Sequence, residues 1–377
     1  MNIVGFIVGI LLIFGILQDS FESIILPRRV SRKFRLSRFF YITLWLLWSA
    51  LGRKMRVGNR REYYLSYFGP LSLILLVVVW ATVLVVGFAL VQWGLGSQVS
   101  APEKIPDFGT DLYMSGTTFI TLGLGDVLPH EGIARLVTVL EAGMGFAFLA
   151  LIIGYVPIIY QAFSKREVNI SLLDARAGSP PTATELLRRH CKGAHTEALV
   201  EYLRDWEKWC AELLESHLSY PVLTYYRSQH ERQSWLAALT TIMDVCALIM
   251  VGLHDVPIKP AKFVFAIARH AAVDLAQVYG TPPSLEAKRL SRDDFARLRD
   301  ELAANGIILG DGEDVERKLA ELRGMYEPFV EALSKHLLMP LPGWMPTADR
   351  VDDWETSAWD HFLQSTPRTL DRAIRRD

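Results

Sequence analysis

Thr117-Thr118-Phe119-Ile120-Thr121-Leu122-Gly123-Leu124-Gly125-Asp126 is the stretch around which this chain is organised. It carries two glycines separated by one residue, ends on an acid, and lies between two long apolar runs. Glycine adopts left-handed backbone that a side chain disfavours, so a threonine followed by Gly-x-Gly can point successive carbonyls the same way. Carbonyls aligned like this can replace the water shell of a small cation. Because the pattern is short, its flanks decide its meaning.

Three long apolar segments predict membrane spans. Residues 2–26 are interrupted only by Asp19 and Glu22, and are long enough for a hydrocarbon core of roughly 30 Å. No charged residue occurs between Tyr63 and Pro102, and residues 71–93 form the second predicted span. Residues 133–163 form the last one. Between these two spans, residues 111–120 have the length of a helix that cannot cross alone.

Residues 39–51 are apolar, but 13 residues fall short of the about 17 to 25 needed to cross. Basic clusters flank them on both sides: Arg28, Arg29, Arg32, Lys33, Arg35 and Arg38, then Arg53, Lys54, Arg56, Arg60 and Arg61. A crossing would place the clusters on opposite faces, against the positive-inside rule. We therefore predict an interfacial helix on the cytoplasmic face, with Trp45 and Trp48 at headgroup depth. A further span is the alternative. Asp19 and Glu22 are expected to pair with the first basic cluster.

The order span, half-helix, Gly-x-Gly-Asp, span describes a re-entrant module. Non-helical backbone at membrane depth is tolerated only where it is buried in protein or lines a water-filled path. Residues 70–165 resemble the pore domain of potassium channels, whose filter is a ring of backbone carbonyls. The family reads Thr-Val-Gly-Tyr-Gly-Asp where this chain reads Thr-Leu-Gly-Leu-Gly-Asp. A glycine-rich external hairpin between two ordinary spans is the alternative.

The resemblance implies a selectivity filter and an acid at its outer mouth, formed by Thr121, Leu122, Gly123, Leu124 and Gly125, and by Asp126. Leu124 replaces the family's tyrosine and so lacks the hydroxyl that ties the filter to the pore helix in relatives. Tyr113 and Met114 replace the paired tryptophans of many pore helices. Potassium selectivity is the favoured interpretation, and a weakly selective cation pore is the alternative.

Three residues of the last span are gating candidates. Gly145 lies 20 residues beyond Gly125, similar to the family's inner-helix hinge glycine. Pro157 lies near where inner helices converge and would bend the helix. Glu141 is an acid at membrane depth, one turn before Gly145, and such residues are functional candidates. The glycine could equally serve close helix packing, and the glutamate could brace the pore helix as a hydrogen-bonded carboxyl.

The second half of the chain predicts a soluble helical domain. Glycine and proline residues in 174–184 indicate a linker, and Pro328 should kink or divide the helix expected near the end. The apolar stretch 235–253 contains Asp244 and predicts the buried central helix of a bundle. The sequence contains no Gly-x-Gly-x-x-Gly turn that would indicate a nucleotide site. It also contains no arginine-rich span that would indicate a voltage sensor. Isolated histidine pairs such as His270 and Asp274 do not indicate a metal site, and the three cysteines are predicted to be reduced.

The sequence therefore predicts an all-α membrane protein of the potassium channel superfamily, of the bacterial type with one pore loop per chain. Its predicted domains are an N-terminal span with a basic interfacial helix, a pore domain, a linker and a helical cytoplasmic domain, at residues 1–62, 63–168, 169–184 and 185–377. One loop supplies one wall of a filter, so we expect a homotetramer in the inner membrane, with the N-terminus outside. We expect no enzyme activity, no cofactor beyond permeating K⁺, no metal site and no nucleic-acid partner. An unknown cytoplasmic ligand and a non-conducting receptor or scaffold remain open.

Overall fold

The computed structural model describes residues 2–26, 35–101, 106–191, 196–229, 233–254, 256–286, 289–310 and 312–346. Helices dominate these residues, which confirms the predicted all-α class. The chain divides into two compact units. We call residues 1–163 with 219–226 the N-terminal unit, and residues 164–218 with 227–377 the C-terminal unit. Arg28 to Lys33 of the first basic cluster lie outside the described residues.

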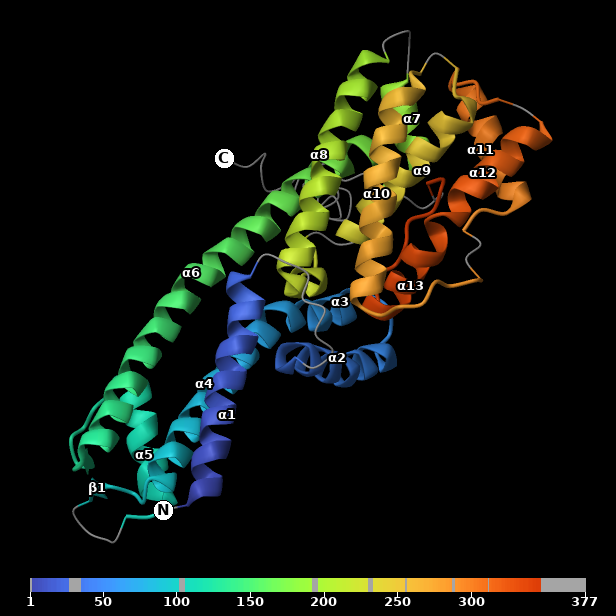
Figure 1. The fold of residues 1–377 in the computed structure, drawn as a ribbon. Coiled ribbons are helices and arrows are strands. Elements are labelled where there is room, and N and C mark those ends of the chain that lie inside the picture. The colour runs from blue at the N-terminus through green and yellow to red at the C-terminus, as the bar shows by residue number, and fades with distance from the viewer. Residues whose placement is uncertain are drawn as a thin grey trace, which may run out of the picture. The chain divides into compact units, whose positions relative to one another are not determined.

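The N-terminal unit consists of helices joined by short connections (Figure 1). Its elements are α1 (Ile3–Ser20) with a π-helical turn (Phe21–Ile25), α2 (Leu36–Lys54), α3 (Asn59–Ser66), α4 (Phe68–Gly94), β1 (Val99–Ser100), α5 (Phe108–Phe119), β2 (Leu128–Pro129) and most of α6 (Gly132–Ala177). β1 and β2 pair antiparallel, a strand pair that the sequence analysis missed. In the C-terminal unit, Leu253 and Leu309 form an isolated antiparallel bridge.

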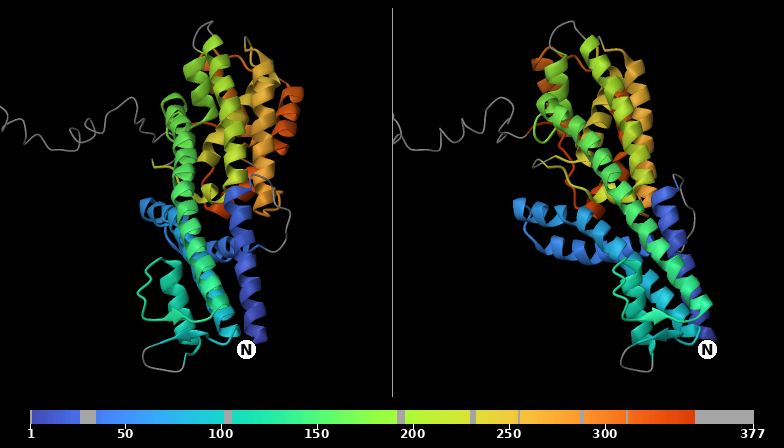
Figure 2. Two further views of the ribbon diagram at one scale, coloured as in Figure 1. Left: turned by 60° about the vertical axis from the view of Figure 1, so that its left-hand side comes forward. Right: turned by 90° about the vertical axis from the view of Figure 1, so that its left-hand side faces the viewer.

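Small residues let α1 and α4 pack closely. A Cβ atom on Gly9 would lie 2.6 Å from the Gly87 carbonyl oxygen, and one on Gly94 would lie 2.6 Å from Phe6 Cβ. Close backbone approach at glycines is the usual way in which helices associate inside lipid. The Asn2 amide also donates to the Gly94 carbonyl at 3.0 Å. The N-terminus thus lies at the same end of the unit as β1 and the start of α5 (Figure 2).

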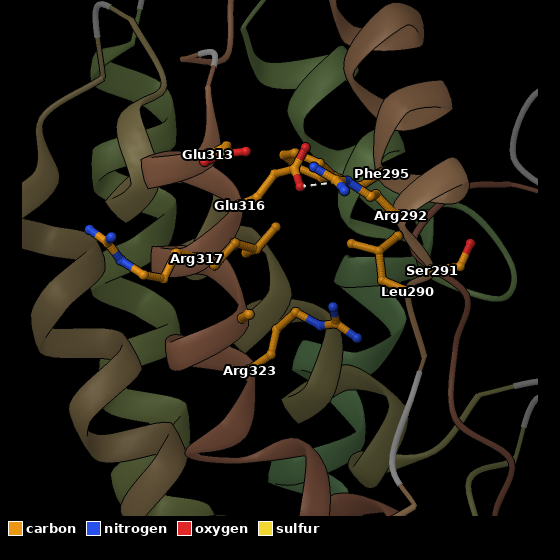
Figure 3. Close-up of a pocket in the computed structure, with 10 residues that line it drawn as sticks. Leu290, Ser291, Arg292, Phe295, Glu313, Glu316, Arg317 and Arg323 are labelled. Carbon is orange, nitrogen blue, oxygen red and sulfur yellow. Dashed lines mark ion pairs between the residues drawn. The ribbon is translucent and has the colours of Figure 1, made fainter.

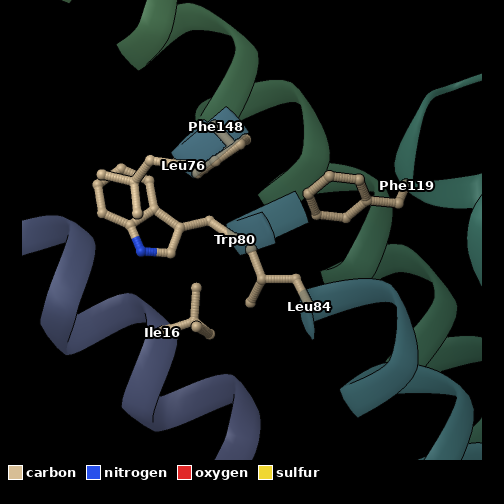
Figure 4. Close-up of a cluster of buried hydrophobic side chains, with 6 residues drawn as sticks. All are labelled: Ile16, Leu76, Trp80, Leu84, Phe119 and Phe148. Atoms are coloured by element: carbon tan, nitrogen blue, oxygen red, sulfur yellow. The ribbon is translucent and has the colours of Figure 1, made fainter. Parts of the chain in front are cut away.

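A cluster of buried apolar side chains joins α1, α4, α5 and α6 (Figure 4). Its members are Ile16, Leu76, Trp80, Leu84, Phe119 and Phe148. Phe119 is the last residue of α5, and its ring lies 6.0 Å from that of Phe148 on α6. The cluster therefore fixes the point at which α5 ends and the Gly-x-Gly loop begins.

The helix α2 differs from expectation in its contacts. Trp45, expected at headgroup depth, is buried against protein, and its ring centroid lies 4.8 Å from that of Phe68. The Trp48 ring stacks on the Tyr64 ring, with 4.7 Å between the ring centroids. Aromatic partners from other parts of the chain therefore cover this face of α2, and the headgroup depth of both tryptophans stays a prediction. The opposite face of α2 exposes apolar side chains, as an interfacial helix would.

The two acids of the first apolar segment have different partners. Glu22 Oε2 lies 3.8 Å from Arg35 Nε, the expected pairing with the first basic cluster. Asp19, by contrast, is buried and accepts hydrogen bonds from the Ser37 amide at 3.1 Å and from Trp80 Nε1 at 2.9 Å. The expected pairing of Asp19 with arginines is replaced by this neutral cage, which ties α1 to the start of α2 and to α4. These hydrogen bonds offset part of the cost of burying the carboxyl group.

Among the described residues, four helical stretches are long and apolar enough to cross a membrane: Ile3–Ile25, Asn59–Gly94, Gly132–Ala177 and Trp235–Gly252. The predicted interfacial helix, within α2, is not one of them. The first three stretches contain the expected spans. The fourth, α9, is almost wholly buried inside the C-terminal unit, as expected of the central helix of a bundle.

The helix α6 does not end where the linker was expected. It continues unbroken to Ala177, so residues 169–177 are helical and only 178–182 form a turn. Ile170 and Leu173 continue its buried face, and no glycine or proline occurs between Pro157 and Gly178. Helix-breaking residues occur only at the end of the predicted linker, which explains the difference.

The C-terminal unit packs helices around α9. They are α7 (Ala183–His190), α8 (Glu197–Ser219), α9 (Trp235–Gly252), α10 (Ile258–Val278), α11 (Arg292–Ala304), α12 (Glu313–Gly324) and α13 (Glu327–Leu337). Pro328 begins α13, so the predicted division of the last helix is confirmed.

A buried ion pair holds α9 in the core of the C-terminal unit. Asp244 of α9 accepts two hydrogen bonds from Arg289, at 3.0 and 2.8 Å, and one from the Tyr326 hydroxyl at 2.5 Å. Burial opposes the charge of Arg289, but Asp244 outweighs it and holds the pKa of the guanidinium above its ordinary value. This paired, hydrogen-bonded arrangement is the form in which buried charges are tolerated.

Candidate functional site

The helix α5 is held firmly at both ends. At its start, Asp107 and Thr110 form a reciprocal capping box, in which the Thr110 amide donates to Asp107 Oδ1 at 2.9 Å. One turn on, the buried Asp111 accepts from the Ser97 hydroxyl at 2.6 Å. At its end, Phe119 sits in the apolar cluster described above. The predicted half-helix at 111–120 is therefore a helix from Phe108 to Phe119.

The loop after α5 has left-handed backbone at every second residue. The φ angles are 59° at Thr121, 53° at Gly123 and 79° at Gly125, whereas Leu122 and Leu124 keep negative φ. An alternation of left- and right-handed residues gathers amides on one side of the chain and carbonyls on the other. Positive φ is a true outlier for a β-branched residue such as Thr121. Such strain concentrates at functional sites.

Hydrogen bonds from the loop to the last turn of α5 maintain this shape. The carbonyl of Thr117 accepts from the amides of Leu122, at 2.8 Å, and Gly123, at 3.2 Å. The Thr121 amide donates to the Thr118 carbonyl at 3.0 Å. The loop amides therefore point back to α5, which leaves carbonyls for the opposite side.

The acid that closes the loop is bound to α5. The Tyr113 hydroxyl donates to Asp126 Oδ2 at 2.9 Å. In the sequence, Tyr113 was noted only as a replacement for tryptophan, and its role here was missed. It supplies a tie between helix and loop at a different point from the tyrosine that Leu124 replaces.

In a single chain, the loop is uncovered. Residues 120–126 are all exposed, including Leu122 at 56 % and Leu124 at 60 %. The face of α6 away from the cluster is also exposed and apolar, with Val139, Phe146 and Ile153 among its side chains. Apolar surface of this extent marks contact with lipid or with another protein chain.

Gly145 lies directly behind the loop. A Cβ atom there would lie 1.9 Å from the carbonyl oxygen of Phe119, whereas Gly143 and Gly154 have no heavy atom within 4 Å of such an atom. The close approach of α6 to the end of α5 thus requires glycine at position 145. This observation favours the packing interpretation over the hinge, since α6 is continuous through Gly145.

Glu141 is fully buried between α6, α5 and α4. The Ser115 hydroxyl of α5 contacts Glu141 Oε1 and also lies 2.7 Å from the Val85 carbonyl oxygen. In both contacts the Ser115 hydroxyl is the donor, so Glu141 of α6 is joined through this side chain to α5 and to the backbone of α4. This contact favours the interpretation of Glu141 as a hydrogen-bonded brace of α5.

Pro157 lies on the exposed face of α6, away from the buried Tyr155 and Ile159. Although proline removes one backbone hydrogen bond, the helix continues past it. The structure therefore brings Gly145 and Glu141 together behind the loop and places Pro157 about three turns from Gly145, toward the opposite end of the N-terminal unit.

The C-terminal unit contains a cleft of about 450 Å³ between α11 and α12 (Figure 3). Arg292, Arg317 and Arg323 line it, together with Glu313 and Glu316. Arg292 Nε lies 3.0 Å from Glu316 Oε2, and Arg323 Nη2 lies 3.0 Å from Glu327 Oε2. Because its charges are largely matched, the cleft does not identify a ligand. No group of three metal-ligating side chains occurs within the described ranges, and His270 pairs with Asp274 at 3.4 Å.

Comparison with known proteins agrees with this geometry. A family model described as "ion channel" matches residues 72–162, which contain α5, the loop and most of α4 and α6. The chain is 24 % identical over 231 residues to the uncharacterised membrane protein YdjJ of Bacillus subtilis (strain 168), covering 58 % of this chain and 67 % of that protein. No solved structure matches the chain. The chain thus contains an ion-channel domain and is a membrane protein.

Proposed function

We propose that the ion-channel domain at residues 72–162 forms a tetrameric, potassium-selective pore. Carbonyls of Thr121 to Gly125 would strip the hydration shell from the ion, and Asp126 would concentrate cations at the outer mouth. The observation that carries the proposal is left-handed backbone at residues 121, 123 and 125, tied to the end of a buried helix. The negative end of the α5 dipole adds to the attraction for a cation.

Four copies are needed because each chain supplies one loop. The uncovered loop and the exposed apolar face of α6 supply surface that neighbouring copies would bury. A chain with its loop open to lipid would leave unpaired carbonyls in hydrocarbon, which costs several kcal/mol each. Assembly around the loop removes that cost.

We further propose a multi-pass arrangement in the inner membrane, with the loop and the N-terminus outside and the C-terminal unit in the cytoplasm. The bond between Asn2 and Gly94 supports it, since it joins the N-terminus to the end of the unit that carries α5. In this assignment Lys165 and Arg166 follow the last span on the inner side. We propose no enzymatic reaction and no cofactor; K⁺ would be the permeant ion.

Flux measurements test the function. Purified protein in liposomes would be tested for K⁺ and Na⁺ uptake, with Gly123→Ala as the site variant and Gly132→Ala as its matched control. An alanine Cβ meets no atom at either position, but only Gly123 has a positive φ, of 53°. Left-handed backbone costs alanine about 1 to 2 kcal/mol, so Gly123→Ala should reduce K⁺ flux whereas Gly132→Ala should not.

The outcomes separate the alternatives. Equal K⁺ and Na⁺ flux would identify a weakly selective cation channel, which the missing tyrosine at Leu124 would explain. An absence of flux with any cation would favour a non-conducting receptor or scaffold. A monomer or dimer by native mass spectrometry would contradict the four-loop pore.

A further inference from the structure

The chain leaves the C-terminal unit after Leu218, enters the N-terminal unit at residues 219–226, and leaves it again at Arg227. This excursion, which we call the return segment, contains a 3₁₀ helix at Pro221–Tyr225. Val222, Leu223, Thr224 and Tyr225 are all buried. The segment is therefore part of the core of the N-terminal unit, although its sequence belongs to the half of the chain beyond the last span.

The return segment packs on the inner end of α6. Val222 and Leu223 share a buried cluster with Tyr155, Ile159 and Phe163 of α6 and with Leu73 of α4. Two aromatic pairs extend this contact. The ring centroids of Tyr220 and Tyr155 lie 5.8 Å apart, and those of Tyr226 and Phe163 lie 5.5 Å apart. The last two turns of α6 in this unit are thus covered by the segment.

The opposite side of the segment fits α2 and α4. The centroid of the Tyr225 ring lies 4.9 Å from that of Phe68, 5.0 Å from that of Trp45 and 6.2 Å from that of Tyr41. At Gly69, an added Cβ would lie 2.6 Å from the Tyr226 ring. Any side chain at position 69 would displace the Tyr226 ring, so the fit depends on glycine at this position.

Both flanks of the return segment are bound within the C-terminal unit. On one side, Arg166 of α6 lies 3.2 Å from His217 Nε2, and His217 Nδ1 donates to the Leu213 carbonyl at 2.8 Å. On the other side, Arg227 donates to the carbonyls of Leu337, at 2.5 Å, and Leu338, at 3.2 Å, at the end of α13. A movement of α13 would therefore pull on Arg227 and hence on the adjoining segment.

We propose that the return segment is a coupling element, which positions the inner end of α6 and relays to it conformational changes of the C-terminal unit. Tyr225 and Tyr226 are its positioning residues, and Arg227 is its link to α13. In the pore proposed above, on which this inference rests, the inner end of α6 is where the ion path would be opened or closed. The C-terminal unit would then regulate the channel through chain connectivity and packing alone.

The first test is a double-mutant cycle in planar bilayers, with the open-to-closed ratio as the readout. Gly69→Ala should change this ratio by about 2- to 10-fold, the range expected for one aromatic contact. In a Tyr226→Ala background the same change should have no effect, because the obstructing ring is absent. Gly15→Ala, where a Cβ would meet no atom within 4 Å, is the matched control. K⁺ over Na⁺ selectivity should stay the same in all variants. Equal effects of Gly69→Ala in both backgrounds would overturn the fit.

The second test addresses the relay and does not depend on conduction. Amide hydrogen exchange of residues 155–163 should accelerate at least several-fold in Arg227→Ala, although Arg227 belongs to the other unit, and Arg227→Lys should restore part of the protection. Arg317→Ala, at an exposed position, is the control. Unchanged exchange in Arg227→Ala would refute the relay. If wild-type protein conducts no ion, the proposed function fails, and exchange at 155–163 still decides whether the segment positions α6.

Discussion

Replacing Gly145 with alanine distinguishes a packing role from a hinge. In an ordinary helix, alanine is favoured over glycine by about 1 kcal/mol. At this position the new Cβ would lie 1.9 Å from the Phe119 carbonyl oxygen, about 1.5 Å closer than an ordinary contact at 3.4 Å. The obstacle is backbone at the end of α5, so no side-chain rotation relieves it. We therefore expect a net loss of about 1 to 3 kcal/mol, the usual cost of overpacking.

The assay combines thermal unfolding in detergent with cation flux in liposomes. Gly145→Ala should melt several degrees below wild type and should lose K⁺ selectivity, because a shift of Phe119 displaces Thr121 two residues later. Gly143→Ala and Gly154→Ala serve as matched controls on the same helix, since a Cβ at either position meets no heavy atom within 4 Å. Both should match wild type or melt slightly higher.

One result would refute the packing argument. If Gly145→Ala melts with wild-type protein and retains its ion selectivity, while only its open and closed times change, then Gly145 bends and does not pack. The hinge interpretation would stand in that case, and the approach of α6 to Phe119 would have to be loose enough to admit a methyl group.

Three further predictions follow from the contacts of single side chains. Tyr113→Phe removes the hydroxyl donor to Asp126, so it should lower the K⁺ to Na⁺ flux ratio by up to about tenfold; an unchanged ratio would show that this bond does not hold the loop. Glu141→Gln keeps an acceptor for the Ser115 hydroxyl and should preserve assembly and melting temperature, whereas Glu141→Leu should cost about 1 to 3 kcal/mol. The reverse order of stability would contradict a hydrogen-bonded brace. Burial opposes ionisation of Glu185, but hydrogen bonds from two neighbouring arginines outweigh it and lower its pKa from 4.5 to about 2. The unfolded chain therefore binds the proton first, so the stability that this carboxylate contributes is present above pH 4.5 and is lost as the pH falls toward 2. Glu185→Gln should flatten this part of the acid unfolding curve, and an identical curve would exclude the assignment.

Much of the N-terminal unit follows from apolar length and charge. The runs that contain α1, α4 and α6 are long enough to cross, and the uncharged stretch between Tyr63 and Pro102 leaves no other interpretation for α4. The Gly-x-Gly pattern predicted the left-handed backbone at Gly123 and Gly125. It could not predict the same conformation at Thr121, since threonine disfavours it and only the surrounding contacts impose it.

What the sequence could not predict depends on contacts between distant residues. Trp80 lies 61 positions from Asp19, so no local pattern indicates that one caps the other. Tyr225 covers Trp45 from the far half of the chain, so the burial of Trp45 against protein side chains could not be read from its local sequence. Gly145 illustrates a different limit. A glycine at a helix contact and a glycine at a hinge look alike in sequence, and only the distance to Phe119 separates them.

The return segment has a consequence for biosynthesis. The ribosome makes residues 164–218 after the last span and before the part of the chain that fills the space beside Tyr155 and Phe163. Until Tyr226 has been translated, the inner ends of α4 and α6 lack Val222 and Leu223 as neighbours. The membrane-inserted helices therefore wait for the later half of the chain before their own core is complete. A nascent chain stalled between residues 163 and 219 would carry all the helices of the N-terminal unit but lack the segment that completes its core.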